Sequence, residues 1–251
     1  MPHVAITAVL LFVAGVVAGA IGTAGGITSL VAYPALLLTG ISPLAANVTS
    51  SVALIGSGLS SASRAAPDVV GHARTIRRWM PVSVVFSLGG AVLLVVTPSD
   101  VFDRIVPFLV AAGALILLLQ PSITRWQERR GRTWSRPAVA TGVGGVALYN
   151  GYFGAGSGIL LIALLLFTAE PVLHRANALK NVILVASDIL PAVLFAIRGS
   201  VVWGAAIPLG LGAMLGGVIG PSIARRVPQR LMRWLIACCG FALAIWLLVN
   251  P

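Results

Sequence analysis

Long apolar stretches separated by short polar loops run through the whole chain. Their limits at charges, turns and Gly/Pro clusters predict ten helical segments, at residues 4–21, 26–39, 44–63, 78–97, 103–120, 137–152, 157–168, 177–197, 201–221 and 231–249. Most are long enough to cross a hydrocarbon core about 30 Å thick. The second and seventh fall short of the roughly 17 residues that a span needs. We therefore expect segments 26–39 and 157–168 to be re-entrant or parts of broken helices.

A glycine-rich interruption comes directly before each short segment. It reads Gly-Ala-Ile-Gly-Thr-Ala-Gly-Gly at 19–26 and Gly-Tyr-Phe-Gly-Ala-Gly-Ser-Gly at 151–158. Further matches are an Ala-Asn pair at 46–47 and 176–177, and Pro81 with Gly89-Gly90 against Pro208 with Gly216-Gly217. The chain thus reads as a first membrane repeat at 1–120, a basic linker at 121–136 and a second repeat at 137–251. Paired broken helices in two repeats are typical of secondary transporters.

The composition agrees with a membrane protein. Hydrophobic residues make up 58% of the 251 positions, charged residues 9%, and the mean hydropathy is +1.01. These values are far from those of an average soluble domain. The longest polar gap, at 121–136, is too short to fold alone. The predicted fold class is therefore an all-α integral membrane protein, in contact with the lipid bilayer along most of its length.

Charge placement predicts the orientation. Thirteen of the seventeen basic residues lie in the loops 64–78, 121–136 and 222–233, and the positive-inside rule places such loops in the cytoplasm. The loop at 98–104, the turn near Gly199 and both termini are then outside, and the two repeats have inverted topology. The net charge of +11 does not indicate a nucleic-acid partner, because the arginines alternate with apolar segments and form no continuous basic face.

The sequence lacks the residue patterns that metal binding, catalysis and ATP binding require. Cys238 and Cys239 are adjacent in the last apolar segment and are interpreted as small packing residues, and His3, His72 and His174 have no metal-ligand spacing. No nucleophile with a neighbouring base lies at membrane depth, and no ATP-binding Gly-x-x-x-x-Gly-Lys-Ser/Thr motif occurs. We expect no enzyme activity, no cofactor and no metal site.

The chain resembles the TauE/SafE family of sulfite and organosulfonate permeases over nearly its whole length. The resemblance rests on the paired glycine motifs, the Ala-Asn segments, and Gly-Ala-Met-Leu-Gly-Gly-Val-Ile-Gly at 212–220 followed by Ala224-Arg225-Arg226. It implies a permease of the cell (inner) membrane that moves a small anion such as sulfite or an organosulfonate, driven by an ion gradient. The second repeat departs from the family pattern, with Ala178-Leu179-Lys180-Asn181 where the first has Val48-Thr49-Ser50-Ser51.

The glycine breaks are the first candidate for the binding site. Unpaired backbone groups are tolerated at membrane depth only inside protein or beside a water-filled cavity. Glycine permits a close backbone approach, and a helix that starts after a break directs N–H groups at an anion. On this hypothesis Gly22, Gly25 and Gly26 face Gly154, Gly156 and Gly158. The alternative is that the glycines only allow tight helix packing, which is the favoured interpretation for Gly212, Gly216 and Gly220.

Lys180 is the strongest single candidate for an anion-binding residue. It is the only lysine and lies near the start of an apolar segment, and a cation inside the membrane indicates function by default. Its ammonium would attract the anion, with hydrogen bonds from Asn177 and Asn181, and from Asn47, Thr49 and Ser50 of the other repeat. The alternative is that Lys180 extends its ammonium to the membrane interface.

Asp188 lies eight residues after Lys180, about two turns along the same helix face. It is the candidate for binding the coupling ion, H⁺, or for pairing with Lys180, and a purely structural role stays open. Tyr149 and Asn150 are second-rank candidates for the same cavity.

A carrier with alternating access is the leading hypothesis. An anion channel and a non-transporting subunit of a membrane complex are the alternatives. The substrate, the direction of transport and a homo-oligomeric assembly are left open by the sequence.

Overall fold

The computed structural model describes residues 2–25, 28–130, 136–170, 172–198, 201–224 and 229–249. These residues contain helices and no strand. The α-helices are α1 (Pro2–Gly25), α2 (Thr28–Leu38), α3 (Pro43–Ala53), α4 (Ile55–Ala65), α5 (Ala73–Val96), α6 (Ser99–Arg130), α7 (Arg136–Tyr152), α8 (Ser157–Thr168), α9 (Leu173–Arg198), α10 (Trp203–Ala224) and α11 (Gln229–Val249), with a 3₁₀ helix, η1 (Ala66–Val69), after α4. The all-α prediction is confirmed.

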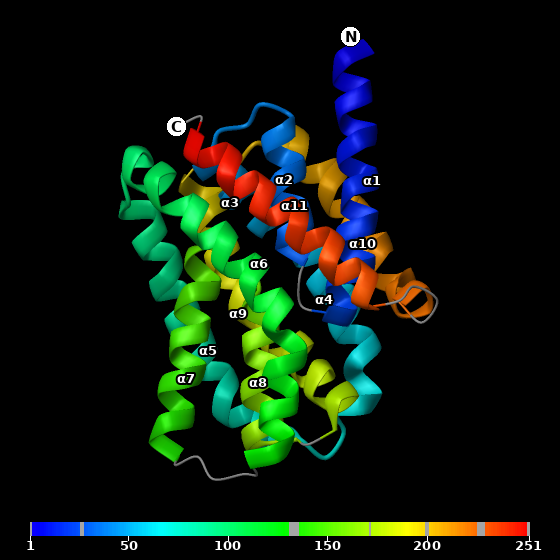
Figure 1. The fold of residues 1–251 in the computed structure, drawn as a ribbon, viewed down its shortest axis with the longest axis vertical. Helices are drawn as coiled ribbons and strands as arrows, with labels where there is room; N and C mark the ends of the chain where they lie inside the picture. Colours follow the sequence, from blue (N-terminus) through cyan, green and yellow to red (C-terminus); the bar gives the residue numbers. More distant parts are fainter. Residues whose placement is uncertain are drawn as a thin grey trace.

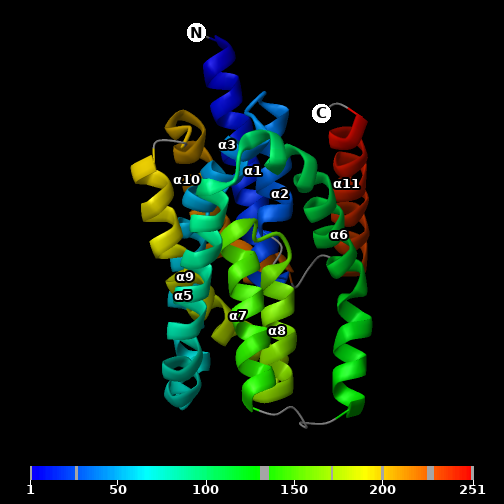
Figure 2. The same ribbon diagram turned by 90° about the vertical axis from the view of Figure 1, so that its left-hand side faces the viewer.

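Most helices run roughly along the long axis of the molecule, and both chain termini lie at the same end, which we call the terminal end (Figures 1 and 2). The link between α4 and α5, the end of α6 and the start of α7 lie at the opposite end, which we call the basic end. Arg64 and Arg74 flank the α4–α5 link, and Arg125 lies in the last turns of α6. The first two basic loops therefore share one end of the molecule.

Two helical hairpins enter the molecule from opposite ends. α1 runs inward from the terminal end and α2 returns to it, whereas α7 runs inward from the basic end and α8 returns there (Figures 1 and 2). The two helices of each hairpin contact each other. α2 and α8 have 11 and 12 residues and agree with the two short segments expected at 26–39 and 157–168. Each is the returning arm of its hairpin.

Glycine brings the long helices into backbone contact. α1 packs along α10, and α5 packs along α7. A Cβ atom on Gly212 or Gly216 of α10 would collide with the carbonyl oxygen of Phe12 or Val16 in α1, and one on Gly90 of α5 would collide with that of Leu148 in α7. The packing interpretation of Gly212 and Gly216 is confirmed.

Three details differ from the expected segments. The helix expected at 44–63 is divided at Leu54 into α3 and α4. α6 continues to Arg130, about ten residues beyond the expected end at 120, because the polar residues after the span keep a helical conformation. Cys238 and Cys239 are exposed on α11, so the prediction that they pack in the interior is wrong.

The apolar surface fits a bilayer. Within the part of the chain that the structure describes, four helical stretches are long and apolar enough to span a membrane: Ala5–Gly22, Ala73–Val96, Ser99–Leu119 and His174–Arg198. Large hydrophobic side chains are widely exposed, among them Val85, Phe108 and Trp246. In water such a surface would be unfavourable, but lipid tails solvate it.

Candidate functional site

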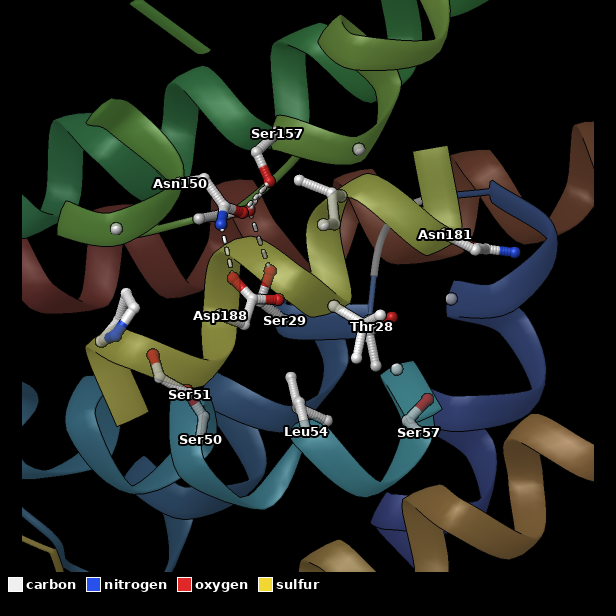
Figure 3. A pocket seen from close by; sticks show the side chains of 18 of the residues that line it. Thr28, Ser29, Ser50, Ser51, Leu54, Ser57, Asn150, Ser157, Asn181 and Asp188 are labelled. Atoms are coloured by element: carbon white, nitrogen blue, oxygen red, sulfur yellow. Dashed lines mark hydrogen bonds between the residues drawn. The ribbon is translucent and has the colours of Figure 1, made fainter. Parts of the chain in front are cut away.

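A polar cavity lies where the inner ends of the two hairpins meet α3, α4 and α9 (Figure 3). Its volume is about 120 Å³, which is enough for several water molecules or one small anion. Much of its lining comes from helix ends and from the junction between α3 and α4, where backbone and small polar groups reach the interior. The α9 side is different, because its lining residues come from the middle of a continuous helix. α1, α2, α3 and α4 of the first repeat and α7, α8 and α9 of the second all contribute residues.

Seven of the expected site residues line this cavity: Gly22, Ser50, Gly154, Gly158, Lys180, Asn181 and Asp188. They come from both halves of the chain, in agreement with the hypothesis of a shared site. Gly22 is needed for a close approach, since a Cβ there would collide with the Thr28 side chain at the start of α2. Gly154 adopts a φ of 79°, in the left-handed region that favours glycine, and thereby turns the chain from α7 toward α8.

The remaining expected residues lie elsewhere. Asn47 donates a hydrogen bond of 2.9 Å to the Tyr152 carbonyl, and Thr49, fully buried, accepts one of 3.0 Å from the Val202 backbone N–H. Gly156, also at a φ of 79°, is the N-cap residue of α8. Gly25 ends α1, Asn177 lies on α9 outside the cavity lining, and Gly26 lies outside the described residues.

Lys180 is 3% exposed and lines the cavity from α9. Among the described residues it has neither a hydrogen-bond acceptor nor an ion-pair partner. In particular, no ion pair with Asp188 forms, although both residues line the same cavity. Burying an ammonium without a counter-charge is unfavourable, and no described residue supplies that counter-charge.

Asp188 belongs to a hydrogen-bonded chain that crosses from α9 to the second helix break. The Asn150 amide donates to Asp188 over 2.6 Å, and the Ser157 hydroxyl donates to the Asn150 side-chain oxygen, also over 2.6 Å (Figure 3). Ser157 also approaches the Gly154 carbonyl at 2.9 Å. Asp188 is therefore coupled to the conformation of the α7–α8 interruption. Tyr149, the other second-rank candidate, lies outside the cavity and donates to the Ala155 carbonyl at 2.6 Å.

The start of α8 is only partly available to a ligand. The backbone N–H of Ser157 donates to the Gly154 carbonyl over 3.1 Å, which closes the turn before the helix. The anion-binding capacity of this helix start is thus smaller than the sequence alone implies, and side chains supply most of the donors.

Except for Ser50, the hydroxyl side chains of the cavity are the part of the site that the sequence analysis missed. Ser57 and Ser61 line the cavity from one face of α4, four residues apart, and Ser50 lines it from α3. This stripe was visible as a pattern of small polar residues in an otherwise apolar segment. Four more cavity hydroxyls come from other helices or positions: Thr28, Ser29, Ser51 and Ser157.

A polar contact joins the two repeats at the basic end. His72, before α5, donates to Glu170, before α9, at 2.5 Å, and Glu170 also accepts from the Val172 backbone N–H at 3.0 Å. Burial opposes ionisation of Glu170, yet these two hydrogen bonds and the nearby His72 and Arg175 hold the pKa of the carboxyl below its ordinary value of 4.5. The contact holds two loops from different repeats together.

The architecture defines the class of protein. A helical membrane bundle whose two hairpins meet at a polar cavity has the construction of a membrane transporter. The family follows from comparison: the model of the sulfite exporter TauE/SafE family matches residues 7–247, and the chain belongs to this family.

Similar proteins carry transporter names. The chain is 30% identical to a probable membrane transporter protein, ORF9, of a Sinorhizobium species, over 96% of this chain and 92% of the relative. It is 27% identical to the probable membrane transporter protein YfcA of Escherichia coli K12, over 96% and 89%. A probable membrane transporter protein of Haemophilus influenzae is also 27% identical, over 92% and 91%. No solved structure matches the chain.

Proposed function

We propose that this protein is a secondary carrier that moves a small sulfur oxyanion, sulfite or an organosulfonate, across the cytoplasmic membrane by alternating access. The observation that supports the anionic substrate is Lys180, which is buried, faces the cavity and has no counter-charge among the described residues. Asn181 and the surrounding hydroxyls supply the hydrogen bonds that an oxyanion accepts.

The packing of the helices supports two inverted repeats. If α1, α2, α5 and α6 correspond to α7, α8, α10 and α11, then the α1–α10 contact exchanges with the α7–α5 contact, and the α6–α11 contact maps onto itself. The opposite entrances of the two hairpins agree with this exchange (Figure 1). Alternating access follows when one half rocks against the other around the shared cavity.

Asp188 is proposed as the coupling group for H⁺. A carboxylate beside Lys180 changes the charge of the cavity when it binds a proton, so anion and proton binding are linked. The hydrogen bond from Asn150 carries this change to the interruption between α7 and α8.

Replacing Lys180 by alanine tests the proposed function. Purified protein in proteoliposomes should take up sulfite in a saturable manner, and Lys180→Ala should lower uptake at low sulfite concentration about 10- to 100-fold, because a charge-assisted hydrogen bond of about 1.5–3 kcal/mol is lost. Arg198→Ala, an exposed cation at the far end of the same helix, is the matched control and should transport normally. Unchanged uptake by Lys180→Ala would remove Lys180 from the site.

The same assay separates the alternatives. A carrier accumulates sulfite against its gradient when a pH gradient is imposed and saturates with concentration. Flux that never saturates and always follows the sulfite gradient would indicate an anion channel. No flux of sulfite, sulfoacetate or taurine, with intact folding, would favour a non-transporting subunit.

A further inference from the structure

A second, much smaller cavity lies beside the first, toward the terminal end. Its volume is about 10 Å³, room for about one water molecule and too little for a sulfur oxyanion. Ser29, Ser50 and Phe153 line both cavities, so these three residues form the partition between them. The other lining residues are Leu30, Tyr33, Pro34, Asn47, Val110 and Ala155.

Tyr33 lines this small cavity, and its hydroxyl is buried without a hydrogen-bond partner among the described residues. Tyr33 is 3% exposed, and its ring is held edge-on against Phe153 with the ring centres 5.3 Å apart. A buried hydroxyl normally has a partner, and an ordered water is the usual one where protein groups are absent. The cavity has the size and the polar lining for that water, since Asn47, Ser29 and Ser50 also face it.

The lining continues along α2 and α6 toward the terminal end. Ser29 and Tyr33 are four residues apart on one face of α2. On α6, Val110 lines the cavity, and Asp103 lies seven residues earlier on the same face. One carboxylate oxygen of Asp103 is buried without a hydrogen-bond partner, and the group is close enough to act electrostatically on Tyr33.

The start of α6 is fixed to the second helix break. The Phe102 ring packs against Tyr152 and Phe153, with ring centres 6.1 and 6.4 Å apart. α6 begins at the terminal end (Figure 2), so its first turns reach solvent there. The charged groups around Asp103 on this helix are Asp100 and Arg104, both exposed.

From these observations we propose a proton route, separate from the anion path, that connects the terminal end with Asp188 through Asp103, Tyr33 and one water in the small cavity. It rests on the proposed coupling of transport to H⁺. Along it each oxygen accepts a proton from one neighbour while its own proton passes to the next, so no charge is left on Tyr33. The Ser29 and Ser50 hydroxyls and the waters of the large cavity complete the connection to Asp188, which shares that cavity with Lys180.

The aromatic rings at the small cavity explain why protons and anions would take different paths. Phe153 and Tyr33 leave space for one water, which passes a proton by exchanging hydrogen bonds. A sulfur oxyanion cannot pass without a movement of these rings. The route therefore allows Asp188 to exchange protons with the solvent at the terminal end while the anion stays enclosed in the large cavity.

Tyr33→Phe tests the route, because it removes the hydroxyl and keeps the ring that packs on Phe153. Two modes of sulfite transport are compared in proteoliposomes: net uptake driven by a pH gradient, and sulfite-for-sulfite exchange, which needs no net proton transfer. We expect Tyr33→Phe to lower net uptake at least tenfold and to keep exchange within twofold. Tyr152→Phe, on a nearby ring that lines neither cavity, should leave the ratio of the two modes unchanged, whereas Asp188→Asn should abolish the response to the pH gradient.

Equal losses in both modes, or no loss, would overturn the route, because the hydroxyl would then serve folding or the anion path. A structure at a resolution that shows ordered waters gives an answer that needs no substrate: a water bonded to the Tyr33 hydroxyl supports the route, and an empty cavity overturns it. Wild-type protein that moves no sulfite in either mode would contradict the proposed substrate, while the water at Tyr33 would still decide the route.

Discussion

At the scale of single residues, a charge buried in a membrane protein indicates a functional role, because burying it is costly. Lys180 and Asp188 line one cavity without pairing with each other, so neither cancels the cost of burying the other. Asp188 has an amide donor in Asn150, whereas Lys180 has no partner among the described residues. This difference supports the different roles proposed for them: an anion-binding role for Lys180, and for Asp188 a role connected to the helix break through Asn150.

Glu170 gives a residue-scale prediction with a definite pH dependence. Its pKa in the folded protein lies below the ordinary 4.5. The ionised carboxylate therefore stabilises the fold fully above about pH 4.5, and this contribution is lost as the pH falls toward the lower folded-state pKa. Glu170→Gln keeps an oxygen for the Val172 N–H but removes the charge that His72 binds. We expect the unfolding temperature at pH 7 to fall by roughly 2–8 °C, for a loss of about 1–2 kcal/mol.

The control for this prediction is the same measurement at pH 4. Wild-type protein should lose part of its stability between pH 7 and pH 4, and Glu170→Gln should lose less, because the variant has no carboxylate there to protonate. Parallel pH profiles for the two proteins would show that the His72–Glu170 contact does not stabilise the fold.

At the scale of elements, glycine has two separate uses. In α1, α5 and α10 it permits backbones to touch, as at Gly90 and Gly212, and in the α7–α8 interruption it permits the left-handed conformation of Gly154 and Gly156. The sequence shows both as runs of small residues. Only the second use opens a cavity, since the first fills space with backbone atoms.

Two glycines of α10 separate these effects experimentally. A Cβ on Gly212 would collide with the Phe12 carbonyl, whereas a Cβ on Gly204 meets nothing. Gly212→Ala should push α10 from α1 and destabilise the protein by about 1–3 kcal/mol. Gly204→Ala should be neutral or slightly stabilising, because alanine favours helix. Thermal unfolding in detergent measures both, and equal effects would contradict the close contact of α1 and α10.

At the scale of the whole molecule, the positions of the basic loops predict how the protein is oriented in the membrane. Both termini lie at one end, and the α4–α5 link with its arginines lies at the other (Figures 1 and 2). From this arrangement and the positive-inside rule we predict that the basic end is in the cytoplasm and the termini are outside.

Single cysteines at opposite ends test this orientation. In a background with Cys238 and Cys239 replaced by alanine, Ser99→Cys lies at the terminal end and Ala66→Cys at the basic end, both at exposed positions. A membrane-impermeant thiol reagent added to intact cells should label only the first, and permeabilised cells should show both. The reverse pattern would invert the orientation and place the termini in the cytoplasm.

The sequence by itself determined the membrane class, most of the helical segments and the two short helices, and it singled out Lys180 as a candidate, which the structure places in the cavity. These follow from local properties, since the length of an apolar run and the position of glycine decide what a segment can do in lipid. Only the tertiary structure decided which polar groups meet. Thr49 and Ser50 are neighbours in sequence, yet Thr49 binds the Val202 backbone and Ser50 lines the cavity, because successive residues of a helix point in different directions. The partnership of Asn150 with Asp188, 38 residues apart, likewise depends on the packing of α7 near α9, which no local pattern records.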